Sequence, residues 1–206
     1  IPVIVQNVTT KKFVTSFKKS LSTLNQAAIR TIAQYDMDYS AIDIVSKDET
    51  CKNDTFQNGE YSFCGLLNSS LSGHKYLGKY GNFKDANGEN PYSATVINLP
   101  INNYLFFELS DGMFVAFNPN IIKCGIGFGN KIKTTMLTEG ELVNCIGFVD
   151  VNGPNPPNRE IQCETENTKI SVDTTCEVTG TSIGDIFPIV FHDGIAAPAT
   201  NALLNL

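Results

Sequence analysis

The hydrophobic positions near the start of the chain repeat with the period of an α-helix. From Phe13 onward, large apolar residues recur at steps of four or three, which keeps them on a single helical face. No glycine or proline follows Pro2 in this segment, and a proline is tolerated in the first turn because it loses no intrahelical hydrogen bond there. The sequence therefore predicts one amphipathic helix from Pro2 to about Tyr35, roughly 50 Å long. Its expected packing face consists of Phe13, Phe17, Leu21, Leu24, Ala28 and Ile32.

The next segment, residues 36–91, carries weak periodicity and many turn residues. Residues 36–47 fit either an extension of the helix or a short second element, and the pattern does not separate the two. Between residues 48 and 91, pairs such as Asn58-Gly59 and Asn87-Gly88 mark turns. We therefore expect a long irregular connection that faces outward, with a short helix at 63–71. Connections of this length tend to be functional surfaces or to be held by disulfides.

Strand signals crowd together in the second half of the chain. β-Branched and aromatic residues predict strands at 93–99, 103–109, 113–117, 144–151 and 185–191, with a hairpin turn at 110–112. A helix followed by antiparallel strands, without βαβ alternation, indicates an α+β fold. We expect a single domain, residues 1–206, in which an antiparallel sheet of about four to five strands covers the helix. Its parts are a helical spine (1–35), a connecting region (36–91), and the sheet with a C-terminal loop (92–206).

Composition and charge narrow the possible functions. A chain of 206 residues, 42% of them hydrophobic, is long enough to build one sizeable core. The net charge of −6 repels nucleic acid and anionic lipid, so we expect no general nucleic-acid binding. The sequence contains no run of 18 or more apolar residues of the kind that spans a bilayer, and no secretion signal precedes Ile1. We expect either a mature chain or one whose front end was removed.

Six cysteines form an even set without a CxxC pair. Zinc sites built from cysteine usually contain such close pairs, and His74 and His192 are isolated in the sequence, so disulfides are the preferred interpretation. Persistent disulfides imply an oxidising compartment, whereas buried free thiols in a cytosolic core are the alternative. The sequence does not choose among the many possible connectivities. We predict consecutive pairing: Cys51 with Cys64, Cys124 with Cys145, and Cys163 with Cys176.

Motifs of catalysis do not occur in the sequence. It contains no GxSxG elbow, no HExxH helix and no CxxC redox pair, and its glycine-rich segments lack the spacing of a phosphate loop. We therefore expect no enzyme and no cofactor. Asp150, Asn152 and Asn155 resemble the alternating oxygen ligands of a calcium loop, but the later Glu of such a loop is missing. A hydrogen-bonded turn is the preferred interpretation, and no metal is expected.

The most distinctive stretch is FVDVNGPNPPN at residues 148–158, followed after an insertion by GDIFPI at residues 184–189. A strand ends here, Asn-Gly permits a positive-φ turn, and the prolines then hold an extended segment that cannot continue a ladder. This pattern resembles the type IV pilins and pilin-like (pseudopilin) subunits of bacteria, whose C-terminal half commonly carries a strand, a DVNG turn, a PN pair and a G-x-D-x-F strand. The positions that match are Asp150, Asn152, Gly153, Pro154, Asn155, Asp185 and Phe187. The insertion at 159–183 and the tail from His192 to Leu206 depart from the pattern.

The resemblance implies a soluble head domain that lacks the hydrophobic half of the N-terminal helix, because Ile1-Pro2 resembles the junction with that half. It implies a structural subunit of an extracellular type IV pilus, an appendage for adhesion, motility or DNA uptake. The alternatives are a pseudopilin of a type II secretion system and an unrelated secreted adhesin or enzyme. The implied partners are other pilin subunits and, before polymerisation, the inner-membrane assembly machinery, with the membrane anchor lying outside this chain; the surface ligand stays open. Candidates for contacts between subunits are Lys11, Lys12, Lys18 and Lys19, for which a solvated face is the simpler interpretation.

Overall fold

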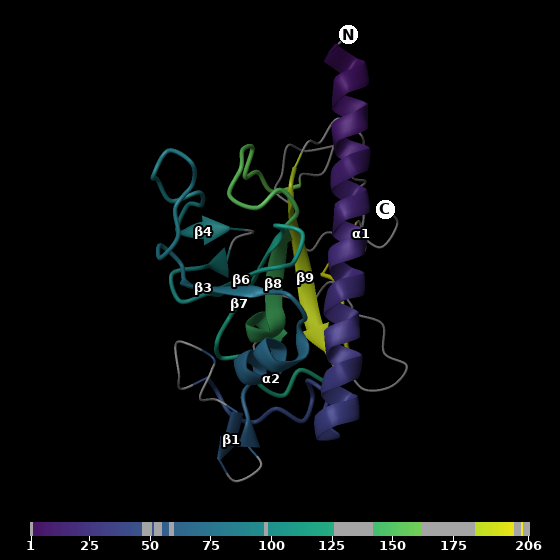
Figure 1. Ribbon diagram of the computed structural model, residues 1–206, viewed down its shortest axis with the longest axis vertical. Coiled ribbons are helices and arrows are strands. Elements are labelled where there is room, and N and C mark those ends of the chain that lie inside the picture. The colour runs from purple at the N-terminus through teal and green to yellow at the C-terminus, as the bar shows by residue number, and fades with distance from the viewer. Residues whose placement is uncertain are drawn as a thin grey trace.

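A long N-terminal helix is the main feature of the fold. The computed structural model describes residues 2–46, 51, 55–57, 60–96, 99–125, 142–161, 184–199 and 203. Helix α1 spans Pro2–Tyr35, as the sequence predicts. It runs along one side of the sheet, and its N-terminal end extends past the sheet (Figure 1). The helix ends where Asp36 adopts a positive φ of 53°. In the part of the chain that the structure describes, no helix has an apolar stretch long enough to cross a bilayer.

The main sheet is antiparallel and has six strands among the described residues. This arrangement places the chain in the predicted α+β class, but the expected number of four to five strands was too low. The additional strands are β3, which comes from the segment predicted to be irregular, and β10, which forms a hairpin with the strand predicted to be the last. In spatial order the strands are β10 (Ile195–Pro198), β9 (Ile186–His192), β8 (Ile146–Asp150), β7 (Phe114–Phe117), β6 (Leu105–Glu108) and β3 (Lys75–Lys79).

Short elements replace one of the predicted strands. The strand expected at 93–99 is instead a two-residue hairpin, β4 (Thr95–Val96) with β5 (Leu99–Pro100), outside the main sheet. Pro100 has no N–H group to continue the ladder. A second small hairpin pairs β1 (Thr55–Gln57) with β2 (Glu60–Tyr61), and a 3₁₀ helix (Leu142–Cys145) leads into β8. The predicted turn between β6 and β7 is confirmed by the bond from Leu109 N–H to Met113 O.

Both faces of the sheet are buried. Leu105 and Phe107 belong to the core beneath the helix, whereas Phe106 belongs to a second core on the far face. Residues 80–96 and 99–104 cover this far face: the Phe83 ring lies 4.7 Å from the Phe106 ring, and the Tyr92 ring lies 5.6 Å from it. The prediction that the whole region 48–91 faces outward was therefore wrong, because aromatic residues within it pack against the sheet.

The buried stripe of α1 differs from the predicted one near its C-terminal end. Phe13, Phe17, Leu24 and Ala28 are buried and Leu21 is partly buried, but Ile32 is 41% exposed. Thr31 is buried in its place, and its hydroxyl donates to Ala27 O (3.0 Å). Steps of four residues exceed the helical turn, so Ile32 lies about 80° around the helix from Leu24, whereas Thr31 stays within about 20°. The prediction for Ile32 was wrong because this drift accumulates over two steps.

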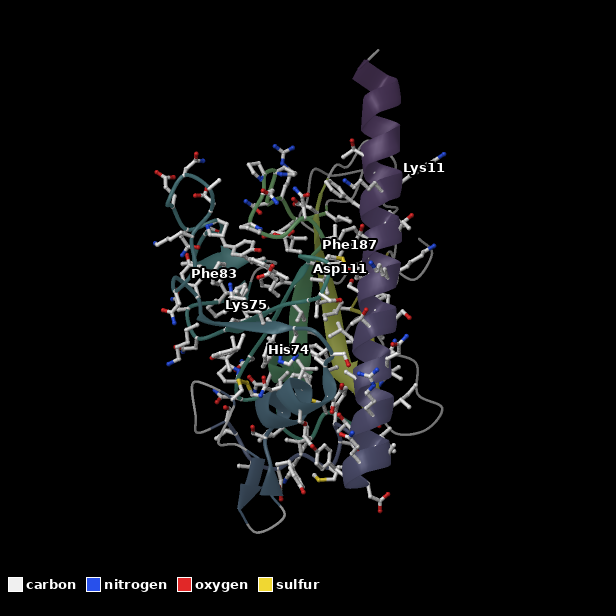
Figure 2. All side chains as sticks on the ribbon, viewed as in Figure 1. Lys11, His74, Lys75, Phe83, Asp111 and Phe187 are labelled. Carbon is white, nitrogen blue, oxygen red and sulfur yellow. A yellow bond between two sulfur atoms is a disulfide. The ribbon has the colours of Figure 1, made fainter. Side chains whose placement is uncertain are left out.

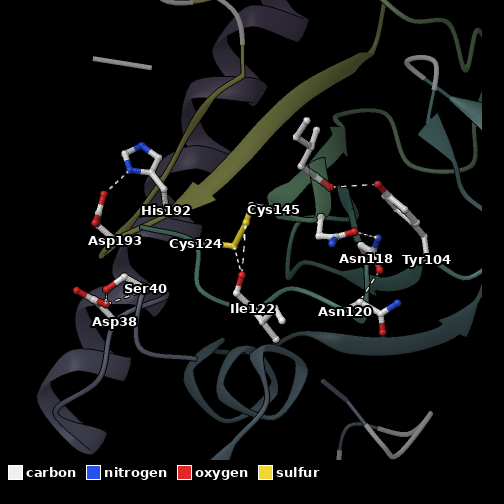
Figure 3. The surroundings of a disulfide bond; sticks show 12 residues. Asp38, Ser40, Tyr104, Asn118, Asn120, Ile122, Cys124, Cys145, His192 and Asp193 are labelled. Carbon is white, nitrogen blue, oxygen red and sulfur yellow. Dashed lines mark hydrogen bonds and ion pairs between the residues drawn. A yellow bond between two sulfur atoms is a disulfide. The ribbon is translucent and has the colours of Figure 1, made fainter. Parts of the chain in front are cut away.

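Two disulfides hold the region between α1 and the sheet. Helix α2 (Phe63–Ser70) forms where a short helix was predicted, and Cys64 in its first turn is bonded to Cys51, with Cα atoms 5.3 Å apart. Cys124 is bonded to Cys145, with Cα atoms 5.9 Å apart, which ties the loop after β7 to the start of β8 (Figure 3). Both pairings were predicted and are confirmed. The third predicted pair, Cys163 with Cys176, lies outside the described residues.

Loss of the second disulfide is expected to destabilise the protein. The bond joins residues 21 apart in sequence, for which loop-closure entropy gives about 3 kcal/mol. We expect the double variant Cys124→Ser, Cys145→Ser to lose about this much unfolding free energy in urea titrations, with an unchanged far-UV circular dichroism spectrum. A urea midpoint equal to that of the native protein would contradict the prediction.

Candidate functional site

The DVNGPNPPN segment forms a turn beyond the end of β8, organised by the buried carboxylate of Asp150. One carboxylate oxygen accepts the backbone N–H of Asn152 (2.9 Å), and the other accepts the hydroxyl of Tyr92 (2.6 Å). Asp150 is fully buried. A carboxylate suits this position because it accepts several hydrogen bonds and donates none. Tyr92 lies 58 residues earlier in the chain, so the carboxylate joins the far-face core to the turn.

Side-chain amides close the same turn. Asn152 Nδ2 donates to Asn155 O (3.1 Å) and Pro156 O (2.8 Å), and Asn155 Nδ2 donates back to Asn152 O (2.9 Å). Gly153 has φ of +61°, and a Cβ atom there would lie 2.6 Å from Gly112 O, so only glycine fits. The predicted Asn-Gly turn therefore rests on both the backbone conformation and the close approach of the β6–β7 hairpin.

Asp185 joins this turn to the start of β9. Its two carboxylate oxygens accept the backbone N–H groups of Asn158 (3.0 Å) and Arg159 (2.7 Å). Its own N–H donates to Arg159 O (2.9 Å), and its carbonyl accepts Val151 N–H (2.9 Å). Arg159, at the start of the insertion at 159–183, is thus bonded to Asp185, which follows the insertion. Most of the insertion, residues 162–183, lies outside the described residues.

Burial of two nearby carboxylates changes their acidity. Burial raises the pKa of Asp150 well above its usual range, and the neighbouring charge of Asp185 raises it further. Burial also raises the pKa of Asp185, although the N–H groups of Arg159 and Asn158 act in the opposite direction. The pKa of Tyr92 is raised by its burial and by the charge of Asp150. Burial in this cluster therefore makes the Asp150 carboxyl group a weaker acid in the folded state than in the unfolded chain.

The carboxylates of this cluster hold the turn together by hydrogen bonds. Both carboxylates are fully buried, and the turn uses their oxygen atoms as hydrogen-bond acceptors. Among the residues that the structure describes, no group of three or more His, Cys, Asp or Glu side chains could hold a metal ion. A cleft of about 230 Å³ lies beside the turn, lined by Tyr92, Ser93, Val96, Pro157, Asn158, Arg159, Glu160 and Ile186. The hydroxyl of Tyr92, one of these lining residues, is bonded to Asp150.

The structure separates one residue from the predicted turn motif. Phe187 lies on the other face of the sheet, away from the remaining residues of the motif. Those that lie together at the turn are Asp150, Asn152, Gly153, Pro154, Asn155 and Asp185. Its ring stacks on the Phe17 ring of α1, with centroids 4.4 Å apart and an interplanar angle of 13° (Figure 2). Phe187 therefore fixes the helix rather than the turn. Sequence reasoning missed Tyr92, for which the sequence gives no local signal.

The outer face of α1 is a second candidate site, because its chemistry differs from that of the rest of the chain. Helix α1 contains five Lys and Arg residues and no Asp or Glu. Because the whole chain carries −6, the residues outside the helix carry a net charge of about −11. Lys19 forms an ion pair with Asp111 (2.9 Å), while Lys11 and Lys12 are exposed, and Lys11 points away from the sheet (Figure 2). Ile29 is 64% exposed on the same helix.

Comparisons of the sequence with models of known protein families, with curated proteins and with solved structures found no match. The described residues contain two candidate functional sites. The first is a buried, hydrogen-bonded turn, and the second is the exposed basic face of α1.

Proposed function

We propose that the chain is the head domain of a structural subunit of an extracellular type IV pilus filament. The observation that supports this proposal is the form of α1: one face is buried against the sheet, the other is open, and the N-terminal end extends past the sheet (Figure 1). Helical turns that extend past the core gain no stability from packing against it, so they are not explained by the core alone. Such a helix is suited to contacts with neighbouring subunits.

The charge distribution favours association between copies of the chain. The helix is basic and the remainder is acidic, so the helix of one copy attracts the head of another. Contact between two different surfaces of the same chain is heterologous, and heterologous contacts produce open helical polymers when the rotation does not close. Within this proposal, Lys11 and Lys12 contact the neighbouring head, and Ile29 adds apolar area to the contact.

The disulfides of the head favour a location outside the cell. Two disulfides restrain the region between α1 and the sheet, and the turn after β8 is closed by its own side chains. Disulfides persist in oxidising compartments, in agreement with a protein displayed on a surface. Loops carried on a rigid scaffold are the usual place for recognition, so we place the unknown surface ligand at these loops.

The coding sequence upstream of Ile1 tests the proposal. We expect a short basic leader followed by about 20 to 25 apolar residues that continue α1. Immunogold labelling with an antibody to this head should then decorate filaments sheared from the cell surface. An ordinary cleavable signal peptide upstream would overturn the proposal and favour a secreted adhesin or enzyme. Labelling confined to the periplasm would favour the alternative, a pseudopilin of a type II secretion system.

A further inference from the structure

The side chain of Asn25 on α1 makes two hydrogen bonds with one residue of the edge strand. Its Nδ2 donates to Ala196 O (3.1 Å), and its Oδ1 accepts Ala196 N–H (2.7 Å). The two residues are 171 apart in sequence. A side-chain amide carries a carbonyl oxygen that accepts and an NH₂ group that donates, so it can bond both the N–H and the C=O of one residue, as a peptide strand does. Asn25 therefore supplies both bonds that a neighbouring strand would give to Ala196.

The register of β10 explains why Ala196 has these groups to offer. Residues of an antiparallel pair alternate between bonding their partner and pointing their polar groups away from it. Ala196 lies opposite Phe191, and Ala199 N–H donates to Pro188 O (3.0 Å), so residues 195, 197 and 199 bond β9. Ala196 and Pro198 then face away from the sheet. Pro198 has no N–H group, so Ala196 carries the one N–H of β10 that points outward between Ile195 and Pro198.

Burial makes the bonds to Asn25 important. Ala196 is 2% exposed, so water does not replace a missing partner of its backbone groups. Unpaired edge strands are open to pairing with another chain, and proteins commonly cover them. Gln26, the next residue of the helix, is exposed to solvent, whereas Asn25 lies against β10. Only the amide at position 25 therefore makes this contact.

We propose that Asn25 is a latch that closes the β10 edge of the sheet and sets the position of α1 against the β9–β10 hairpin. The apolar stripe of α1 holds the helix by contacts that tolerate small shifts, whereas two directional bonds to one residue fix its position along the strand. The latch does not depend on the proposed function. In a filament, it would join the helix that packs among the subunits to the sheet of the head.

Hydrogen exchange of single backbone amides tests the latch in the full chain. In the native protein, Ala196 N–H is expected to exchange as slowly as Ala197 N–H, although it points away from β9. In Asn25→Ala we expect Ala196 to exchange about 10 to 100 times faster, while amides in β8 and β9 keep their protection. The matched control, Gln26→Ala on the same helix, should leave Ala196 unchanged.

A second variant separates the two bonds. Asn25→Asp keeps an oxygen that accepts Ala196 N–H but has no donor for Ala196 O, so its Ala196 amide should stay more protected than in Asn25→Ala. Fast exchange of Ala196 in the native protein would overturn the latch without any variant. Exchange that rises equally across β8, β9 and β10 in Asn25→Ala would also overturn it, because general destabilisation would then explain the effect.

Discussion

Replacing Phe17 with alanine is expected to remove about 3 to 5 kcal/mol from the free energy of unfolding. Phe17 is 1% exposed, and its ring stacks on the Phe187 ring of β9 in the contact between α1 and the sheet. The substitution leaves a cavity that the flanking helix and sheet cannot fill by a small movement, because both are regular elements. Urea denaturation followed by circular dichroism measures the loss.

The matched control for this prediction is Ile29→Ala. Ile29 lies on the same helix but is 64% exposed, so its truncation should cost less than about 1 kcal/mol in the isolated chain. Equal losses in the two variants would show that the sheet does not cover the predicted face of α1. A large loss of unfolding free energy for Phe17→Ala alone would show that the buried face of α1 holds the helix on the sheet.

The helix was predictable because its signal is long and local. More than 30 residues follow Pro2 without a glycine or proline, and from Phe13 to Tyr35 the apolar residues keep a helical period, which excludes a strand. The end near Tyr35 follows from the weaker pattern after it. The error at Ile32 shows the limit of counting in steps of four. Thr31 was overlooked because its hydroxyl is polar, although a threonine in a helix can satisfy that group with the carbonyl four residues earlier.

The central strands of the sheet were predicted from the sequence, whereas the two edge strands were not. Strands β6, β7, β8 and β9 carry dense aromatic and β-branched residues. The first three lie within the predicted segments, and β9 extends one residue beyond its predicted segment, to His192. Strand β3, with the sequence KYLGK, contains a glycine and two lysines, and its pairing with β6 contains a bulge. Edge strands are often short, charged and bulged, so their sequences give weak strand signals.

The candidate site was predictable only where its residues are neighbours in sequence. The Asp150-to-Asn155 turn follows from the Asn-Gly pair and the prolines after it. Tyr92 and Asn25 act across 58 and 171 residues, respectively, and neither segment carries a motif. Long-range polar contacts depend on the final packing of elements, which periodicity does not specify.

Replacing Asp150 with alanine is expected to cost about 3 to 5 kcal/mol of unfolding free energy, because it leaves the buried Tyr92 hydroxyl and the partly buried Asn152 N–H without their acceptor. Thermal and urea unfolding at constant pH measure this loss. The neighbouring variant Asn155→Ala is the control: it also weakens the turn, but Asn155 is exposed, so water replaces its bond and the cost should stay near 1 kcal/mol. A similar cost for both variants would contradict a central role for the buried carboxylate.

The raised pKa of Asp150 also makes the free energy of unfolding depend on pH. The pKa of Asp150 is raised on folding, so the folded state binds this proton more tightly than the unfolded state. The stabilisation is complete below the unfolded pKa of about 4 and is lost as the pH rises through the folded value. Asp150→Asn carries a neutral group at all pH values, so its melting temperature should fall less than that of the native protein between acid and neutral pH. Asp185, whose pKa is also raised, should preserve part of the slope in this variant. Melting curves of the two proteins with parallel pH dependence would show that Asp150 has the same proton affinity in the folded and unfolded chains.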